Sequence, residues 1–142
     1  MIAACDEIMA VINQPNFKEL TNGAFFDKNT IVPNEDENAK FLQLDFGICK
    51  DENGNLVPKL IELQGFPSLY FFQELLGRKY RKHFGNAIPE NYSQHLNGMT
   101  NHDYVELLRQ EIVGDTNPKQ VILLEIEPEK QATAIDFYAT EA

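Results

Sequence analysis

Residues 41–73, FLQLDFGICKDENGNLVPKLIELQGFPSLYFFQ, contain two strand-like segments separated by a turn. The turn signal is Asn53-Gly54, because both residue types tolerate the positive φ of a type I′ turn. We therefore predict an antiparallel hairpin with strands at Phe41–Cys49 and Leu56–Gln64 and a two-residue loop between them.

The two-residue loop fixes which side chains of the hairpin face each other. It predicts that Asp45 lies opposite Glu62 and that Phe46 lies opposite Ile61. Since side chains alternate along a strand, Gln64 is expected on the same face as the two carboxylates, and the other face is apolar.

Directly opposed carboxylates repel each other unless a proton, a basic side chain or a cation lies between them. Asp45, Glu62 and Gln64 together offer the hard oxygen ligands that Mg²⁺ takes, with water and phosphates completing the shell. A solvated sheet face, with the charges apart in water, is the alternative. A glycosidase carboxylate pair is formally possible too, but the sequence has no aromatic sugar platform that we can identify.

Length and composition indicate one soluble globular unit: 142 residues, 43% of them hydrophobic. The chain has 12 basic and 22 acidic residues and a net charge of −10, which argues against nucleic acid or an anionic membrane as the main partner. Cys5 and Cys49 are isolated, and the N-terminal residues lack a signal-peptide pattern, so a cytoplasmic location is expected. No apolar run approaches the roughly 20 residues of a membrane span.

Apolar spacing and capping signals predict four helices, at residues 2–12, 17–20, 68–83 and 100–113. Ser68 is the expected N-cap of the third helix, and Thr100 with Asp103 forms a capping-box-like start for the fourth, which Gly114 ends. A short strand is expected around Phe25, Phe26, Ile31 and Val32.

The predicted helix at 68–83 has two distinct faces. Its apolar residues are expected to pack together on one side: Leu69, Phe72, Leu76, Tyr80 and Phe84. The other side carries the basic cluster, which consists of Arg78, Lys79, Arg81, Lys82 and His83. This cluster could receive a phosphate, a carboxylate or an acidic partner, or it could simply complement the helix dipole at the C-terminus.

Near the C-terminus, Val121–Ile126 is an almost unbroken apolar run, typical of a strand buried on both faces. Glu127-Pro128-Glu129 follows as the expected start of a helix, so the pair predicts half of a βαβ unit. Standard phosphate-binding loops are absent, and the three histidines lack zinc-ligand spacing.

Asp45 followed by Glu62-Leu63-Gln64 resembles the metal-binding segment of ATP-grasp carboxylate–amine ligases, in which an acidic residue precedes an E-x-N. Gln64 stands where that family usually has Asn. Pro67-Ser68 and the later β-α segment resemble the circularly permuted group related to glutathionylspermidine synthetase-like ligases. The resemblance implies Mg²⁺ and ATP as cofactors, with Asp45, Glu62 and Gln64 as metal ligands.

Residues and resemblance together predict an α+β fold: an antiparallel hairpin-containing sheet with packed helices, followed by the start of a Rossmann-like β-α unit. Residues 1–98 are expected to form a partial ATP-grasp-like region, and residues 99–142 a helix plus the β-α unit. A lobe supplying phosphate-binding lysines is not found, so the resemblance implies a fragment, a split enzyme or a degenerate relative. The remainder of a longer protein is then an expected partner.

The resulting hypothesis is a Mg²⁺–nucleotide half-site of an ATP-dependent carboxylate–amine ligase, acting on a small carboxylate substrate. Arg78, Arg81 and Ser68 are the expected contacts for phosphate or the substrate anion. The alternative is a non-catalytic interaction domain that docks an acidic partner on the basic helix Arg78–His83.

Overall fold

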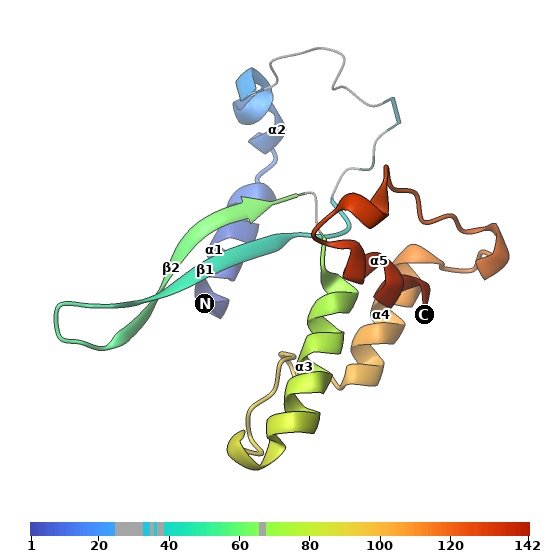
Figure 1. Ribbon diagram of the computed structural model, residues 1–142. Coiled ribbons are helices and arrows are strands. Elements are labelled where there is room, and N and C mark those ends of the chain that lie inside the picture. The colour runs from blue at the N-terminus through green and yellow to red at the C-terminus, as the bar shows by residue number, and fades with distance from the viewer. Residues whose placement is uncertain (25–32, 35, 37–38, 66–67) are drawn as a thin grey trace. The chain divides into compact units, whose positions relative to one another are not determined.

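The computed structural model describes residues 1–24, 33–34, 36, 39–65 and 68–142 (Figure 1). It combines several helices with a two-stranded antiparallel sheet, in agreement with the predicted α+β class. The chain divides into two compact units, Met1–Phe66 and Pro67–Ala142. The boundary expected after residue 98 falls inside the second unit. The short strand predicted between residues 25 and 32 lies outside the described residues.

The first unit begins with two helices at the positions that the sequence predicts. Helix α1 spans Ile2–Ile12 and ends where the Asn13 N–H donates to the Met9 carbonyl, two residues before Pro15. Helix α2 spans Phe17–Thr21 and continues into a 3₁₀ turn at Asn22–Ala24.

The second part of this unit is the predicted hairpin, strand β1 at Gln43–Lys50 and strand β2 at Leu56–Gln64 (Figure 1). Its loop differs from the prediction. The Asp51 N–H donates to the Asn55 carbonyl at 2.9 Å, so three residues, 52–54, form the loop. Only Gly54 has positive φ there, 81°, which is the arrangement of a three-residue loop closed by a left-handed glycine.

Asp51 explains why the loop is one residue longer than predicted. Its Oδ1 accepts hydrogen bonds from the N–H groups of Asn53 and Asn55, at 2.9 and 2.8 Å. The Asn55 side-chain amide donates to Oδ2 at 3.1 Å and is the largest cause of the lowered pKa of Asp51. An aspartate that binds the backbone ahead of it stabilises the turn from this position.

The longer loop shifts the register near the turn, and a bulge shifts it back. Phe46 pairs with Leu60, not with Ile61, so that part of the prediction is wrong. Ile61 is an extra residue in β2, and beyond it Asp45 faces Glu62 as predicted. A β-bulge inserts one residue into one strand, which cancels the one-residue shift made by the loop.

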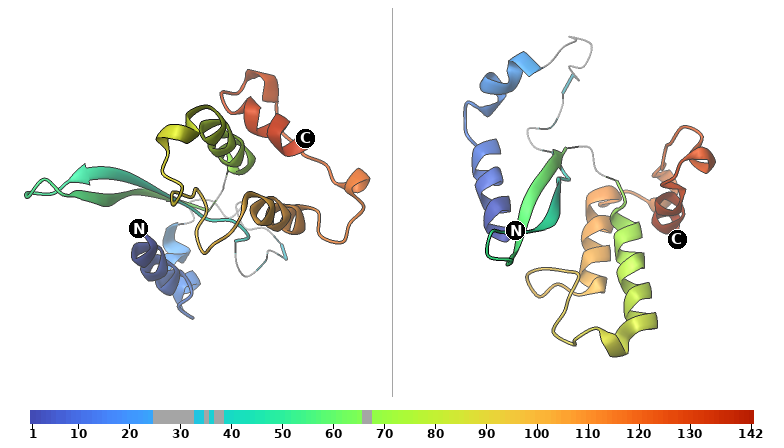
Figure 2. Two further views of the ribbon diagram at one scale, coloured as in Figure 1. Left: turned by 90° about the horizontal axis from the view of Figure 1, so that it is seen from below. Right: turned by 60° about the vertical axis from the view of Figure 1, so that its left-hand side comes forward.

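The second unit is built on helices α3 (Tyr70–Phe84), α4 (Asn101–Ile112) and α5 (Ala134–Glu141). Helices α3 and α4 run side by side in opposite directions, as Figure 1 and the right-hand view of Figure 2 show. On α4, Leu108 is 3% exposed, and the Tyr104 hydroxyl donates to the Tyr70 carbonyl of α3 at 3.3 Å. No helix in the described part of the chain is long and apolar enough to cross a membrane.

Helix α4 begins and ends as predicted. The Thr100 hydroxyl accepts from the Asp103 N–H at 3.2 Å, while the Asp103 carboxylate accepts from the Thr100 N–H at 2.9 Å. This reciprocal pair is a capping box, and its hydrogen bonds lower the pKa of Asp103. Gly114, with φ 55°, follows the helix end.

The face that α3 buries agrees with the prediction only at the start of the helix, where Leu69 and Phe72 are half-buried. Leu76, Tyr80 and Phe84 are exposed, and the last two pack on each other with ring centroids 5.8 Å apart. Glu74 is 5% exposed, and it lines the same hollow as Phe71. Tertiary contacts with α4 and α5 therefore decide which face is buried, and the apolar count along the helix does not.

Val121–Ile126 does not form the predicted buried strand in this structure. Ile122 and Leu124 are 82% and 85% exposed. A strand needs a hydrogen-bonded neighbour, and the described residues supply none here. The helix expected to begin at residues 127–129 starts later: a 3₁₀ turn occupies Pro128–Lys130 and helix α5 begins at Ala134. Without the strand, the β-α unit is not formed.

Candidate metal and anion sites

One face of the hairpin carries four polar side chains at the end remote from the loop. Gln43 pairs with Gln64, and Asp45 with Glu62. Gln43 Nε2 donates to Asp45 Oδ1 at 3.1 Å, and Gln64 Nε2 donates to Glu62 Oε1. Each carboxylate thus has one amide donor on its own strand and still faces the other carboxylate. We call Asp45 and Glu62 the acidic pair.

The ligands around the acidic pair fit a cation that keeps most of its coordination for water or phosphate. Mg²⁺ is commonly bound through one or two carboxylates together with substrate phosphates. Within the described residues, no group of three or more His, Cys, Asp or Glu side chains could hold a metal on its own. The acidic pair therefore does not form a closed metal cage with other such side chains of the described residues.

The amide oxygens distinguish the two glutamines. The Gln64 amide nitrogen is turned toward Glu62, so its oxygen reaches a metal only after the amide rotates. Gln43 Oε1 is buried, and nothing in the described part of the chain donates to it, which leaves an oxygen ligand unused. Gln43 was not among the predicted ligands, although alternation along the strand places it opposite Gln64 and two residues from Asp45 on the same face.

Ser68 does not cap α3 as predicted. Leu69 is the N-cap residue, with φ 70°, and the caps come from α5. The Asp136 carboxylate accepts from the N–H groups of Leu69 and Phe72, both at 2.9 Å. A helix N-terminus attracts phosphate, but here a carboxylate of the protein already occupies it, close to the exposed Ser68.

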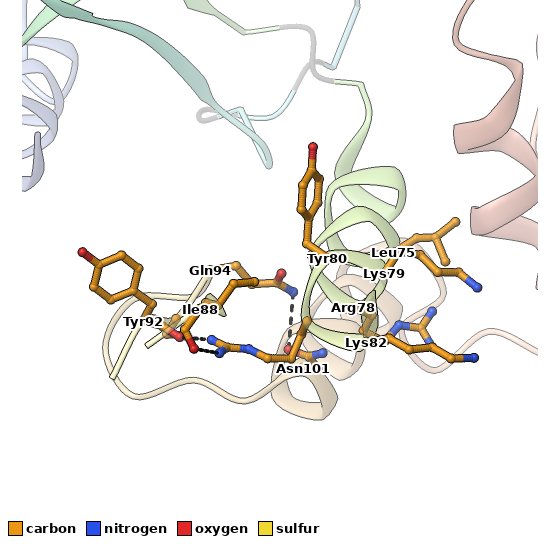
Figure 3. A pocket seen from close by; sticks show the side chains of 12 residues that line it. Leu75, Arg78, Lys79, Tyr80, Lys82, Ile88, Tyr92, Gln94 and Asn101 are labelled. Carbon is orange, nitrogen blue, oxygen red and sulfur yellow. Dashed lines mark hydrogen bonds between the residues drawn. The ribbon is translucent and has the colours of Figure 1, made fainter. Parts of the chain in front are cut away.

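Arg81 holds the segment between α3 and α4. Its guanidinium donates to the carbonyls of Ile88 at 3.1 Å, Pro89 at 3.3 Å, and Tyr92. Figure 3 shows this loop on one side of α3, with the Gln94 amide reaching toward the helix. In this structure the guanidinium that we expected to contact a ligand contacts the backbone.

Gly77 allows that loop to lie close to α3. A Cβ built on Gly77 would fall 1.1 Å from Gln94 Oε1, so any larger residue would displace this side chain. Gln94 Nε2 in turn donates to Asn101 Oδ1 at 3.4 Å. The absence of a side chain at position 77 thus brings the loop amide to the start of α4.

Arg78 is positioned by a buried carboxylate. Glu74 is 5% exposed, and Arg78 Nε lies 2.9 Å from its Oε1 and 3.0 Å from its Oε2. The arginine side chain is 58% exposed. Since both contacts use Nε, the two terminal nitrogens of the guanidinium are left for a ligand.

Arg78 borders two hollows of the second unit. The first has a volume of about 920 Å³ and is lined by all the lysines and arginines of the basic cluster and by residues of the loop between α3 and α4 (Figure 3). In that view Arg78, Lys79 and Lys82 project on the side of α3 opposite to Gln94. The second hollow, of about 700 Å³, lies among α3, α4 and α5, and Arg78 is its one lysine or arginine among the described residues.

Tyr104 is a neutral structural group of the second unit. Burial raises its pKa to about 12, and nearby Tyr70, Asp136 and Glu74 act in the same direction. Its ring stacks on His95 with centroids 4.8 Å apart. Its hydroxyl therefore stays a hydrogen-bond donor near neutral pH and does not serve as a base there.

Comparisons with protein-family models, with curated proteins and with solved structures found no match to this chain.

Proposed function

We propose that the hairpin is the Mg²⁺–nucleotide half-site of an ATP-dependent carboxylate–amine ligase of the ATP-grasp type. The observation that carries this proposal is the opposition of Asp45 and Glu62 on one face of the hairpin. Two carboxylates that face each other gain most from a divalent cation between them. The resemblance of Asp45 and Glu62-Leu63-Gln64 to the family motif supports the same assignment.

In this proposal Asp45 and Glu62 hold the cation, and Gln43 or Gln64 adds an amide oxygen after its amide rotates. Bound Mg²⁺ would supply charge stabilisation at the nucleotide phosphates. Arg78 remains the proposed contact for a substrate anion, because its terminal nitrogens are free of Glu74. Arg81 and Ser68 remain weaker candidates, since Arg81 binds the loop and Asp136 caps the helix beside Ser68.

The proposal includes a Rossmann-like β-α unit that begins at Val121. Val121–Ile126 has the composition of a buried strand, yet its residues Ile122 and Leu124 are 82% and 85% exposed. Such a segment requires a neighbouring strand, which a further part of the enzyme would provide. The phosphate-binding lysines of the nucleotide site would come from elsewhere too.

A thermal-shift titration with ATP, Mg²⁺ and both together tests the proposal. A ligand that binds only the native state raises the apparent Tm by mass action. We expect a shift that needs both ligands and disappears in the double variant Asp45→Asn/Glu62→Gln. The matched control is Glu52→Gln, an exposed acid in the hairpin loop. No shift at millimolar ligand, or the same shift in the double variant, would count against the half-site.

A second function is favoured by the exposed lysines on α3. Lys79 and Lys82 project from one side of the helix and, in the described part of the chain, no acidic side chain pairs with them (Figure 3). They could dock an acidic partner in a non-catalytic interaction domain. Lys79→Gln/Lys82→Gln is then the informative variant, because Arg78 and Arg81 also hold Glu74 and the loop.

For that second function we expect capture of an acidic partner to weaken with salt and to be lost in the lysine variant. The acidic pair should be dispensable. Capture that is insensitive to ionic strength, or unchanged in the lysine variant, would exclude docking on this patch.

A further inference from the structure

We infer that the hollow among α3, α4 and α5 binds a small organic carboxylate through the terminal nitrogens of Arg78. The hollow measures about 700 Å³, within the range of small-molecule sites. Arg78 enters it with its Nε fixed on Glu74, so the outer edge of the guanidinium is oriented before any ligand arrives. A planar guanidinium edge matches the two oxygens of a carboxylate.

The burial of Glu74 is the feature that points to a ligand-binding role for Arg78. A carboxylate that is 5% exposed must be paired, and Arg78 Nε contacts both of its oxygens. The arginine itself remains 58% exposed. The pair therefore positions a cationic fork at the edge of the hollow and does not hide it in the core.

Two donors on α4 border the same hollow. Asn101 Oδ1 lies 2.9 Å from His95 Nε2 and accepts from Gln94 Nε2 at 3.4 Å, so its amide oxygen faces the loop and its NH₂ group remains as a donor. His102 lies beside it in the wall. An oxyanion at Arg78 would thus meet hydrogen-bond donors from two helices.

Charge balance favours a carboxylate over a phosphate. Among the described residues that line this hollow, Arg78 is the one fixed cation, and Glu74 already offsets its charge. A dianion would meet the field of Glu74 without a second cation to balance it. The lysines of the basic cluster line the other hollow. Val105, Ile135 and Leu75 supply an apolar wall suited to the carbon part of an organic acid.

This inference concerns residues 67–142 alone and does not rest on the metal site proposed for the hairpin. Carboxylate binding in the absence of Mg²⁺ and ATP would support it even if the acidic pair bound nothing. Conversely, failure here would leave the thermal-shift test of the acidic pair unaffected.

The test is a titration of the ¹⁵N-labelled full chain with sodium butyrate, with butyramide and inorganic phosphate as comparison ligands. We expect butyrate to shift saturably the amide signals of residues 101–105 and 135–140, which flank the hollow. Butyramide has the same shape without the charge and should leave them in place. Phosphate should bind more weakly than butyrate.

Arg78→Gln should weaken butyrate binding about tenfold or more, as expected for loss of a charged hydrogen-bonding partner. Arg78→Lys keeps a cation near Glu74, so the variant should fold. It lacks the planar guanidinium, so it should bind butyrate more weakly than the wild type. The control Lys82→Gln removes the cation one turn away and should bind like the wild type.

Equal shifts with butyrate and butyramide, or unchanged butyrate binding in folded Arg78→Lys, would overturn the inference. Tighter binding of phosphate than of butyrate, with loss in Lys82→Gln, would assign the anion to the basic cluster instead.

Discussion

Asp136 should be the side chain of α5 on which the stability of the second unit depends most. Its carboxylate accepts from the N–H groups of Leu69 and Phe72, both at 2.9 Å, and thereby caps a helix more than 60 residues away in sequence. Replacing it by alanine leaves two half-buried donors at the start of α3 without acceptors.

The magnitude follows from these two hydrogen bonds. Loss of an N-cap acceptor costs about 0.5–2 kcal/mol, and hydrogen bonds to a charged group lie at the upper end. For two donors served by one carboxylate we expect Asp136→Ala to destabilise the unit by about 2–3 kcal/mol. Asp136→Asn keeps one acceptor and loses the charge, so about 1 kcal/mol is expected.

The assay is thermal and urea unfolding of the full chain followed by helical circular dichroism. In a unit of this size each kcal/mol lowers Tm by about 4–8 °C, so a loss of about 2–3 kcal/mol in Asp136→Ala should lower Tm by about 8–24 °C. The control is Glu141→Ala on the same helix, for which no comparable contact exists among the described residues. An Asp136→Ala variant within about 0.5 kcal/mol of the wild type would refute the capping account.

Three further perturbations have defined outcomes. Gly54→Ala places a side chain at φ 81° where nothing lies within 4 Å, so its cost in stability is purely conformational, about 1 kcal/mol. The loss should appear as faster amide hydrogen exchange in the β1–β2 ladder, and unchanged exchange would contradict the loop geometry. Thr100→Ala should cost about 1 kcal/mol in urea unfolding. The pKa of Asp103 is lowered from 3.8 first by the Thr100 backbone N–H, which the variant keeps, so the contribution of the Asp103 carboxylate is present above pH 3.8 and is lost in both proteins as pH falls through the lower folded-state pKa. The Thr100 hydroxyl still accepts from the Asp103 N–H at low pH, so part of the difference between variant and wild type should persist there, and its complete disappearance would argue otherwise. The pKa of Tyr104 is about 12 in the folded unit and near 10 when unfolded, so its effect on stability is fully present below pH 10 and is lost as pH rises toward 12. Ultraviolet titration should show a late tyrosinate step that Tyr104→Phe removes. If the step remained in Tyr104→Phe, it would belong to another tyrosine.

In the hairpin, the pairing of Asp45 with Glu62 was predicted correctly although the loop length and the bulge were not. Alternation and turn chemistry were sufficient to predict β1, β2 and the opposition of Asp45 and Glu62. The Asp51 turn and the bulge at Ile61 were not predicted, and each changes the register by one residue in opposite senses. Bulges have no reliable local signal, because they depend on how side chains on both strands pack.

Features of the second unit depend on contacts that no local pattern reports. Periodicity predicted that α3 exists, but the buried face was wrong beyond its first turn, because Glu74 is buried through its pairing with Arg78 and the packing of α4 and α5. Capping by Asp136 joins segments far apart in the chain, so Ser68 was the natural local choice. Composition alone could not tell whether residues 121–126 would find a partner strand.

The central proposal is that Asp45 and Glu62 bind a divalent cation together with nucleotide phosphate. Mn²⁺ occupies the same carboxylate and phosphate ligands as Mg²⁺ and broadens nearby NMR signals, so Mn²⁺–ATP added to the ¹⁵N-labelled chain locates the site directly. We predict selective broadening of amides around Asp45 and Glu62, retained in Glu52→Gln and lost in Asp45→Asn/Glu62→Gln. Broadening that is uniform over the acidic surface, or unchanged in the double variant, would contradict the proposal.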